Sequence, residues 1–338
     1  MIVDRAYESG DRRAFLRLPG YQQHGEVLLK LEGLNPTGSI KVKTAREMVL
    51  SALADGTLRA GMHLIESTSG NLGVALASIC AAENLRLTVV TDPNANAQSV
   101  RHIEALGAEV VTVTRHDPNG GYLQTRIDCI AARLAADPEL VWLNQYGNTA
   151  NPRAHRTTTA REIEAELGAP DWIFVGVGSA GTLMGCLSHF RAVHSPTRVV
   201  AVDAAGSVTF GGAPGTRRIP GLGASRRPEL FRDGPDFDKC VVAEADTILV
   251  CRRVARRYGL LVGGSTGTAL AAVSAMGESI LPGSRVVVIS PDLGERYLDT
   301  IYNDGWVLDH YGPELARAIA CDAAGVIDRA PARVVAGM

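Results

Sequence analysis

The segment Asn35-Pro36-Thr37-Gly38-Ser39-Ile40-Lys41 places a lysine at the point where an apolar run turns into a helix. If that turn holds Lys41 partly out of water, desolvation lowers the pKa of its ammonium group and favours the nucleophilic neutral amine. A lysine that forms a Schiff base with an aldehyde cofactor needs such an environment. The alternative is a solvated lysine on a helix, and three other segments bear on the choice.

The first is the glycine-rich segment Gly176-Val177-Gly178-Ser179-Ala180-Gly181, which follows an expected strand and opens an expected helix. Free N–H groups at a helix N-terminus bind anions. The segment could bind the pyrophosphate of a dinucleotide at the helix N-terminus, while Asp203 at the end of the next strand binds the ribose. It fits equally a single phosphate monoester held with the hydroxyls of Ser179 and Thr182. Glycines that only allow close packing are the third alternative, and the motif alone leaves the choice open.

Two further turns carry hydroxyl and amide groups. One of them, Glu66-Ser67-Thr68-Ser69-Gly70-Asn71, lies between an expected strand and an expected helix, where free backbone donors suit an α-carboxylate. The side-chain amide of Asn71 can form a hydrogen bond to a hydroxyl group on the ring of a ligand. Gly263-Gly264-Ser265-Thr266-Gly267 is a similar turn, and Asn144-Gln145-Tyr146 ends another strand. Ordinary helix caps and turn chemistry are the alternatives for each.

Alternating strands and helices are expected to position these turns. We expect strands at 27–31, 62–66, 85–91, 109–114, 140–145, 172–177, 198–203 and 285–290. The helices expected between them are 44–58, an apolar helix with Leu72, Leu76, Ile79 and Cys80 on one face, and 98–106, 122–136, 156–167, 182–193, 246–258 and 268–277. This order predicts parallel sheets with right-handed crossovers. Residues 204–238 are rich in glycine and lack periodicity, which favours a functional lid. At 338 residues, two domains are expected.

Composition restricts the function classes. The chain is 46% hydrophobic and 21% charged with a net charge of −2, which gives no sign of a nucleic-acid or membrane partner. Apolar runs of transmembrane length and an apolar signal-peptide core are both lacking, so we expect a cytoplasmic protein. The six cysteines are scattered without a C-x-x-C pair, which argues against disulfides and a zinc site, and we expect no metal.

Together and in this order, the segments ending at Lys41, Asn71, Thr182 and Gly267 resemble the cysteine synthase and cystathionine β-synthase family of fold type II (tryptophan synthase β-like) pyridoxal-phosphate enzymes. The resemblance covers about residues 10–310 and displaces the dinucleotide interpretation. It implies an α/β fold of two domains, each with a mainly parallel sheet flanked by helices. The smaller domain would be 45–148, the larger 10–44 plus 149–310, and 311–338 a C-terminal tail.

The resemblance also implies roles for the motif residues. Lys41 would bind pyridoxal 5′-phosphate covalently, Asn71 its ring hydroxyl, and Ser265 its pyridine nitrogen. The phosphate cup would be Gly178, Ser179, Ala180, Gly181 and Thr182, and the substrate α-carboxylate would be gripped by Thr68, Ser69, Gly70 and Gln145. A hydroxyl on the pyridine nitrogen makes the ring a weaker electron sink and favours β-elimination, with Lys41 as general base at Cα.

Departures from the cysteine synthase pattern occur at Leu72, in the lid, and in residues 291–299. These resemble the N-(2-amino-2-carboxyethyl)-L-glutamate synthases, which join O-phospho-L-serine to L-glutamate by β-replacement through an aminoacrylate. That branch supplies 2,3-diaminopropionate to siderophores or peptide antibiotics, with a pathway oxidase acting on the product, and the family implies a homodimer.

Both substrates of that reaction are anions, and the lid contains candidate cations. Arg217, Arg218 and Arg226 are expected to contact phosphate or carboxylate groups, because guanidinium binds both in a bidentate manner. Solvated lid arginines are the alternative. Three other functions remain as alternatives: a cysteine synthase using O-phosphoserine or O-acetylserine, a cofactor-binding regulatory subunit, and a nicotinamide-binding dehydrogenase.

Overall fold

The computed structural model describes residues 3–8, 14–22, 25–68, 70–118 and 120–323. Its strands are β1 (Phe15–Arg17), β2 (Gly25–Leu31), β3 (His63–Ser67), β4 (Arg86–Thr91), β5 (Glu109–Thr112), β6 (Leu140–Trp142), β7 (Trp172–Gly176), β8 (Arg198–Ala204), β9 (Asp238–Val242) and β10 (Ser284–Ser290). Its helices are α1 (Lys41–Ala54), α2 (Asn71–Ala82), α3 (Ala97–Ala105), α4 (Leu123–Ala136), α5 (Ala150–His155), α6 (Arg161–Leu167), α7 (Gly181–Ala192), α8 (Glu244–Tyr258), α9 (Gly264–Ala275) and α10 (Asp304–Ala323).

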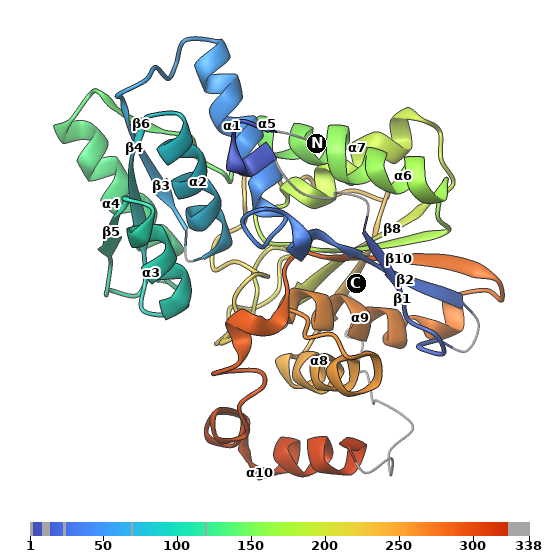
Figure 1. Cartoon of the computed structure of the whole chain (residues 1–338). Helices are drawn as coiled ribbons and strands as arrows, with labels where there is room; N and C mark the ends of the chain where they lie inside the picture. The colour runs from blue at the N-terminus through green and yellow to red at the C-terminus, as the bar shows by residue number, and fades with distance from the viewer. Residues whose placement is uncertain (1–2, 9–13, 23–24, 69, 119, 324–338) are drawn as a thin grey trace.

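The strands form two sheets that lie beside each other (Figure 1). One has six strands in the order β1-β2-β10-β7-β8-β9, and the other has four in the order β5-β4-β3-β6. Every neighbouring pair is parallel except β1 with β2. The predicted α/β fold with mainly parallel sheets is therefore confirmed.

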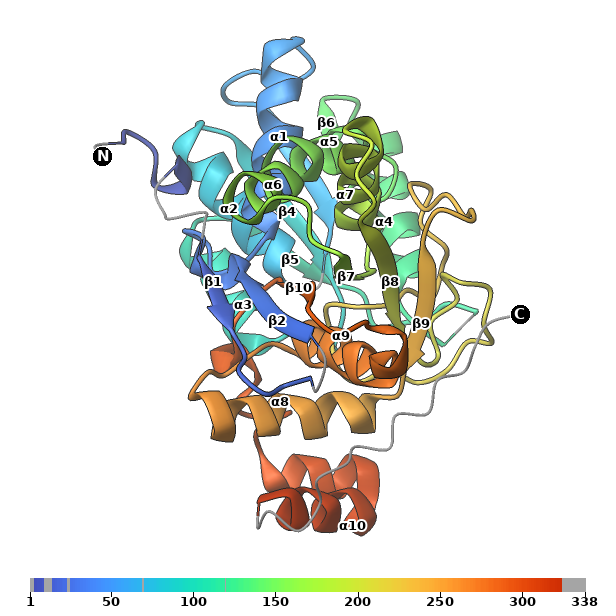
Figure 2. The ribbon, with the colours of Figure 1, turned by 90° about the vertical axis from the view of Figure 1, so that its right-hand side faces the viewer.

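Helices cover both faces of each sheet (Figures 1 and 2). In β10, Val286 and Val288 pack toward α8 and α9, whereas Val287 and Ile289 pack toward α6 and α7. The strand is a continuous apolar run because a parallel strand between two helical layers is buried on both sides. The smaller sheet is covered by α1, α2 and α3 on one face and α4 on the other.

Several element boundaries differ from those expected. Helix α1 begins at Lys41 itself, not at residue 44. The helix expected over 156–167 begins earlier as α5 and passes through a π-helical turn, Arg156–Ala160, into α6. The antiparallel edge strand β1 and the edge strand β9 were not expected, because short edge strands carry little periodic signal.

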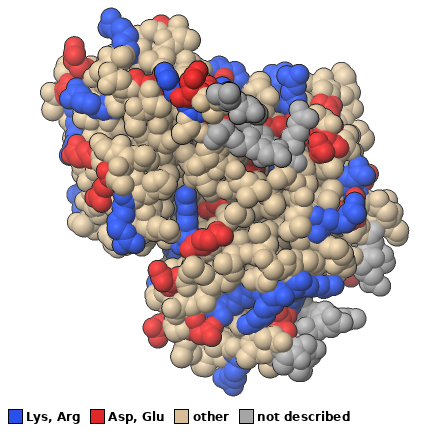
Figure 3. All heavy atoms as spheres, in the orientation of Figure 1, with Lys and Arg blue, Asp and Glu red and all other residues tan. Residues whose placement is uncertain are grey.

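Helix α10 packs against α8, with Leu315 and Ile319 buried in the shared core and a kink at Gly312-Pro313. Residues 311–323, assigned by sequence to the tail, thus form the second half of a packed helix, and 324–338 lie outside the described residues. The exact domain boundaries stay a prediction. Within the described ranges, the helices are too short or too polar to cross a membrane. Acidic and basic side chains are mixed over the face drawn in Figure 3.

Candidate active site

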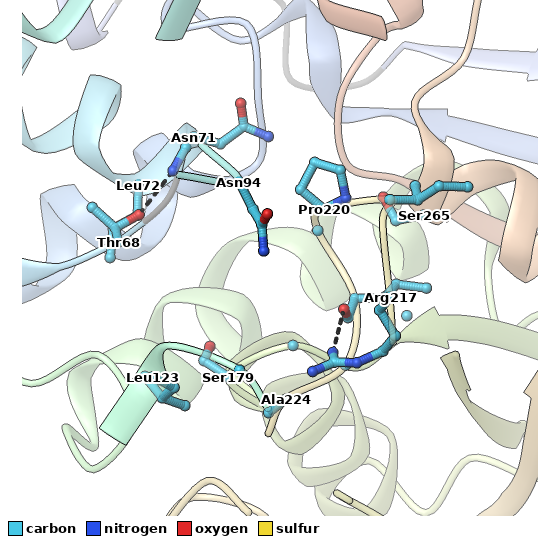
Figure 4. A pocket seen from close by; sticks show the side chains of 18 of the residues that line it. Thr68, Asn71, Leu72, Asn94, Leu123, Ser179, Arg217, Pro220, Ala224 and Ser265 are labelled. Carbon is cyan, nitrogen blue, oxygen red and sulfur yellow. Dashed lines mark hydrogen bonds between the residues drawn. The ribbon is translucent and has the colours of Figure 1, made fainter. Parts of the chain in front are cut away.

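The sequence motifs converge on one cavity of about 940 Å³, lined by segments from both sheets. Loops after the carboxyl ends of parallel strands gather at one place, which brings the motifs together. Figure 4 shows Thr68 and Asn71 facing Arg217 and Ser265 across the cavity. The predicted residues that line it are Lys41, Thr68, Gly70, Asn71, Gln145, Gly178, Ser179, Ala180, Gly181, Thr182, Arg217, Arg218 and Ser265.

Lys41 is the first residue of α1, and the turn before it is fixed by backbone contacts. Ile40 donates its N–H to Pro291 O over 2.8 Å, and Gly38 adopts a φ of +72°, which favours glycine. Burial lowers the pKa of the Lys41 ammonium group, and the nearby Asp292 carboxylate opposes that shift. This is the environment that a nucleophilic lysine requires.

Lys43 lies two residues further on and has a different environment. Its Nζ is 2.8 Å from Glu32 Oε1 and 2.7 Å from Glu162 Oε2 in a buried ion cluster. Of the two lysines, Lys41 lines the cavity. The geometry therefore distinguishes a lysine that lines the cavity from one that is held in an ion cluster.

The Gly178–Thr182 turn has the conformation of an anion cup. Ala180 adopts a φ of +67°, and among the described residues no side chain caps α7. A Cβ at Gly181 would lie 1.9 Å from Asn151 Oδ1, so only glycine fits there, and Asn151 Nδ2 donates to Ser179 Oγ over 3.0 Å. The N–H groups of the turn and the dipole of this 12-residue helix are thus available to a phosphate.

The residues predicted to contact the substrate carboxylate and the cofactor ring also lie at the cavity, apart from Ser69. Gln145 is buried and donates from Nε2 to Ser67 O over 2.8 Å, while Thr68 lies at the cavity wall. Ser265 is buried in the first turn of α9 and lies across the cavity from Asn71 (Figure 4). Ser69 lies outside the described residues.

The predicted lid arginines differ in position. Arg217 lines the cavity, donates from NH1 to Leu222 O over 3.3 Å, and leaves Nε buried without a hydrogen-bond partner in the described structure. Arg218 lines the cavity with an exposed side chain. Arg226 pairs with Glu229 over 2.6 Å outside the cavity lining. Arg226 is thus held by an ion pair away from the cavity in this structure, and its contact with a substrate stays a prediction.

Two arginines that line the cavity, Arg126 and Arg296, are not among the predicted site residues. Arg126 of α4 is buried, lies 3.4 Å from Asp92 through Nε, and has no hydrogen-bond partner for Nε or NH1 among the described residues. It shares the buried face of α4 with Leu123 and Ile130. An arginine on the apolar face of an amphipathic helix was the available sequence signal, because a buried cation needs a partner.

Comparison with known proteins agrees with this geometry. The family described as pyridoxal-phosphate dependent enzymes matches residues 12–292, and the chain belongs to that family. Among individual proteins, the chain is 43% identical over 307 residues to an N-(2-amino-2-carboxyethyl)-L-glutamate synthase from Ralstonia nicotianae, covering 90% of this chain and 88% of the relative. A protein of the same description from Cupriavidus metallidurans is 40% identical over 292 residues, covering 83% and 84%.

Solved structures show the same fold. An O-ureido-L-serine synthase superimposes with a TM-score of 0.82 at 30% identity, covering 92% of this chain and 96% of the other. An O-acetylserine dependent cystathionine β-synthase from Helicobacter pylori also gives 0.82, at 28% identity, covering 90% and 100%. The predicted family is therefore confirmed.

The cofactor of the enzyme is pyridoxal 5′-phosphate, and the cavity fits it. The uncapped turn at Gly178–Thr182 would hold the phosphate, Ser265 would face the ring nitrogen, and Asn71 would face the ring oxygen. Lys41 would hold the aldehyde carbon. When bound, the cofactor withdraws electrons from the bonds at the substrate Cα.

Proposed function

We propose that this enzyme joins O-phospho-L-serine to L-glutamate and gives N-(2-amino-2-carboxyethyl)-L-glutamate and phosphate. In this β-replacement the Cβ–O bond to phosphate breaks, a bond from Cβ to the glutamate nitrogen forms, and that nitrogen loses one proton. The activity named for the two relatives at 43% and 40% identity supports the proposal.

The observation that carries the proposal is the pair of cavity guanidinium groups with unused donors. Arg126 lies on α4 of the smaller sheet, and Arg217 lies in the lid that follows β8. Buried donors without partners are costly, so such groups mark places for anions. A phosphate group and the carboxylates of glutamate are oxyanions that guanidinium binds in a bidentate manner, whereas hydrosulfide, the second substrate of a cysteine synthase, has no pair of oxygens for such a contact.

The other cavity residues match the remaining steps. Thr68, Gly70 and Asn71 at the N-terminus of α2, with the Gln145 amide, would hold the α-carboxylate of phosphoserine. Lys41 would remove the Cα proton as the neutral amine, since burial lowers its pKa. The cavity would exclude water from the reacting carbon while glutamate enters.

A product assay tests this function directly. The purified enzyme with its cofactor receives O-phosphoserine or O-acetylserine, each paired with glutamate or sulfide, and mass spectrometry identifies the products. We expect the phosphoserine–glutamate adduct to dominate and the Lys41→Ala variant to form none. Cysteine as the sole product, with no glutamate adduct from either donor, would instead establish the alternative, a cysteine synthase.

Three wider assignments belong to the same proposal. The product would be consumed by an oxidase that releases 2,3-diaminopropionate for a siderophore or peptide antibiotic, and the enzyme would act as a cytoplasmic homodimer. Light scattering on the purified chain tests the dimer, since a mass near that of one chain would contradict it. Product accumulation in a strain lacking the oxidase tests the pathway.

A further inference from the structure

Asp292 is a buried acid at the cavity wall to which neither the cofactor motifs nor the proposed reaction assigns a task. It follows β10 and is 2% exposed. Its Oδ2 accepts hydrogen bonds from Asn71 Nδ2 over 2.6 Å and from the Tyr297 hydroxyl over 2.8 Å. Its Oδ1 has no hydrogen-bond partner within the described residues. A buried carboxylate oxygen without a donor is costly, so it marks an unfilled contact.

The fold fixes this carboxyl group on the Lys41 side of the cavity. Asp292 forms a β-bridge with Ser39, and its carbonyl accepts from Gly263 N over 3.3 Å. A Cβ at Gly263 would lie 1.8 Å from Asp292 Oδ1, so glycine is required for the carboxyl group to occupy this place. The acid is thereby held between the turn before Lys41 and the helix that begins at Asn71.

The contacts of Asn71 determine which way its amide points. Arg296 NH1 donates to Asn71 Oδ1, and arginine has no acceptor. The amide nitrogen must therefore face Asp292, which accepts. A rotated amide would place its nitrogen against a guanidinium and its oxygen against a carboxylate. One N–H of Asn71 Nδ2 is used by Asp292, and the second is left for a ring oxygen of the cofactor.

We propose that Asp292 is a positioning residue for the cofactor site. Through Oδ2 it fixes the Asn71 amide toward the cofactor, and from beside the turn that leads to Lys41 it supplies a fixed negative charge on the lysine side of the site. The inference concerns cofactor binding and does not depend on which substrates the enzyme takes.

The electrostatics of the site are consistent with this role. Burial raises the pKa of Asp292, and Asn71, Tyr297, Arg296 and Lys41 all act in the opposite direction by hydrogen bonds or charge. Asp292 in turn raises the pKa of Lys41 against the effect of burial. Cys251 is also near, but burial raises the pKa of its thiol to about 12, so it is neutral.

The test is the Asp292→Asn variant, measured without substrate. Two quantities are followed in the holoenzyme: the dissociation constant of pyridoxal 5′-phosphate and the pH midpoint of its visible absorption band. We expect at least tenfold weaker binding. The midpoint should move to lower pH by about one unit, because a carboxylate near a protonated nitrogen favours the charged form. Unchanged affinity together with an unchanged midpoint would overturn the proposal.

Two further variants keep the test decisive. Glu295→Gln removes an exposed acid from the same turn and should leave both quantities at their wild-type values. Tyr297→Phe removes one donor from Asp292 Oδ2 while keeping the ring in place, so it should weaken cofactor binding less than Asp292→Asn. If Asp292→Asn does not fold, wild-type affinity and midpoint in Tyr297→Phe would overturn the proposal. Because no substrate is present, a failed glutamate assay leaves this result unaffected.

Discussion

Lys43 Nζ lies 2.8 Å from Glu32 Oε1, and both side chains are almost fully shielded from solvent. Lys30 and Glu162 complete the cluster, with Lys30 Nζ 2.8 Å from Glu162 Oε2. Burial alone would raise the pKa of Glu32, but the ammonium groups of Lys43 and Lys30 hold it below its usual value. Asn35 Nδ2 donates to Glu32 Oε2 over 2.6 Å, so the cluster anchors the turn that leads to Lys41.

Removing one charge from this cluster should destabilise the fold. We expect Lys43→Met to lower the free energy of unfolding by about 3 kcal/mol, because it leaves the buried Glu32 and the partly buried Glu162 with one lysine. Urea unfolding measures the loss. Arg17→Met removes one partner of a largely exposed pair with Glu26 and should cost less than about 1 kcal/mol. Equal losses in both variants would contradict the assigned burial effect.

Lys41, and not Lys43, should carry the cofactor. Borohydride reduction followed by peptide mass mapping should place the cofactor mass on Lys41 in the wild type and in Lys43→Arg. In Lys41→Ala the mass should be missing, because the nucleophile that lines the cavity is gone. Label found on Lys43 in the wild type or in Lys41→Ala would show that the assignment is wrong.

Gly181 should be essential for the phosphate cup. In Gly181→Ala the new Cβ would meet the Asn151 side chain at 1.9 Å, so the turn that presents its N–H groups must shift. We expect cofactor affinity to fall at least tenfold, as measured by fluorescence titration. Gly234→Ala is the matched control, since its Cβ would meet its nearest atom at an ordinary 3.7 Å. Wild-type affinity in Gly181→Ala would show that this turn does not bind the cofactor phosphate.

Arg126 should bind an anionic substrate group. Arg126→Met keeps the apolar stem but removes the unused donors, so we expect KM for O-phosphoserine or glutamate to rise about tenfold to a hundredfold. Steady-state kinetics with each substrate varied in turn shows which one is affected. Arg153→Met, which removes a surface pair with Glu47, is the control and should leave both KM values unchanged. Unchanged KM for both substrates in Arg126→Met would exclude this role.

His155 should make stability depend on pH. It is buried between Thr44 and Thr159, and burial, with the charges of Lys41 and Lys43, lowers its pKa to about 3. The folded state therefore binds fewer protons than the unfolded state below pH 6.5. Stability should be constant above that pH and fall by about 1.4 kcal/mol per unit below it, reaching a loss of about 2 kcal/mol at pH 5.

The measurement is the free energy of unfolding between pH 7 and pH 5. In His155→Gln, the part of the fall in the free energy of unfolding that His155 causes below pH 6.5 should be missing, whatever the stability of the variant at pH 7. His194→Gln, at an exposed position, should keep the wild-type slope. An unchanged slope in His155→Gln would show that other groups cause the acid sensitivity.

The chemistry-bearing turns could be predicted from sequence because their information is local. A glycine at 181, hydroxyls at 179 and 182, and a preceding strand define an anion cup from neighbouring residues alone. The same holds for Lys41 after its turn and for Ser265 at the start of α9. Alternation of apolar strands and helices also predicted the parallel sheets, since burial on both faces imposes that pattern.

Only the tertiary structure decided which distant groups meet. Asp292 is 221 positions from the Asn71 amide it contacts, and Arg126 reaches the cavity from a helix with no recognisable motif. Arg226 carries the same charge as Arg217 and lies nearby in the chain, yet it pairs at the surface. Local sequence sets backbone conformation and periodicity, whereas these contacts depend on how two sheets and a lid pack, which leaves no periodic signal in the chain.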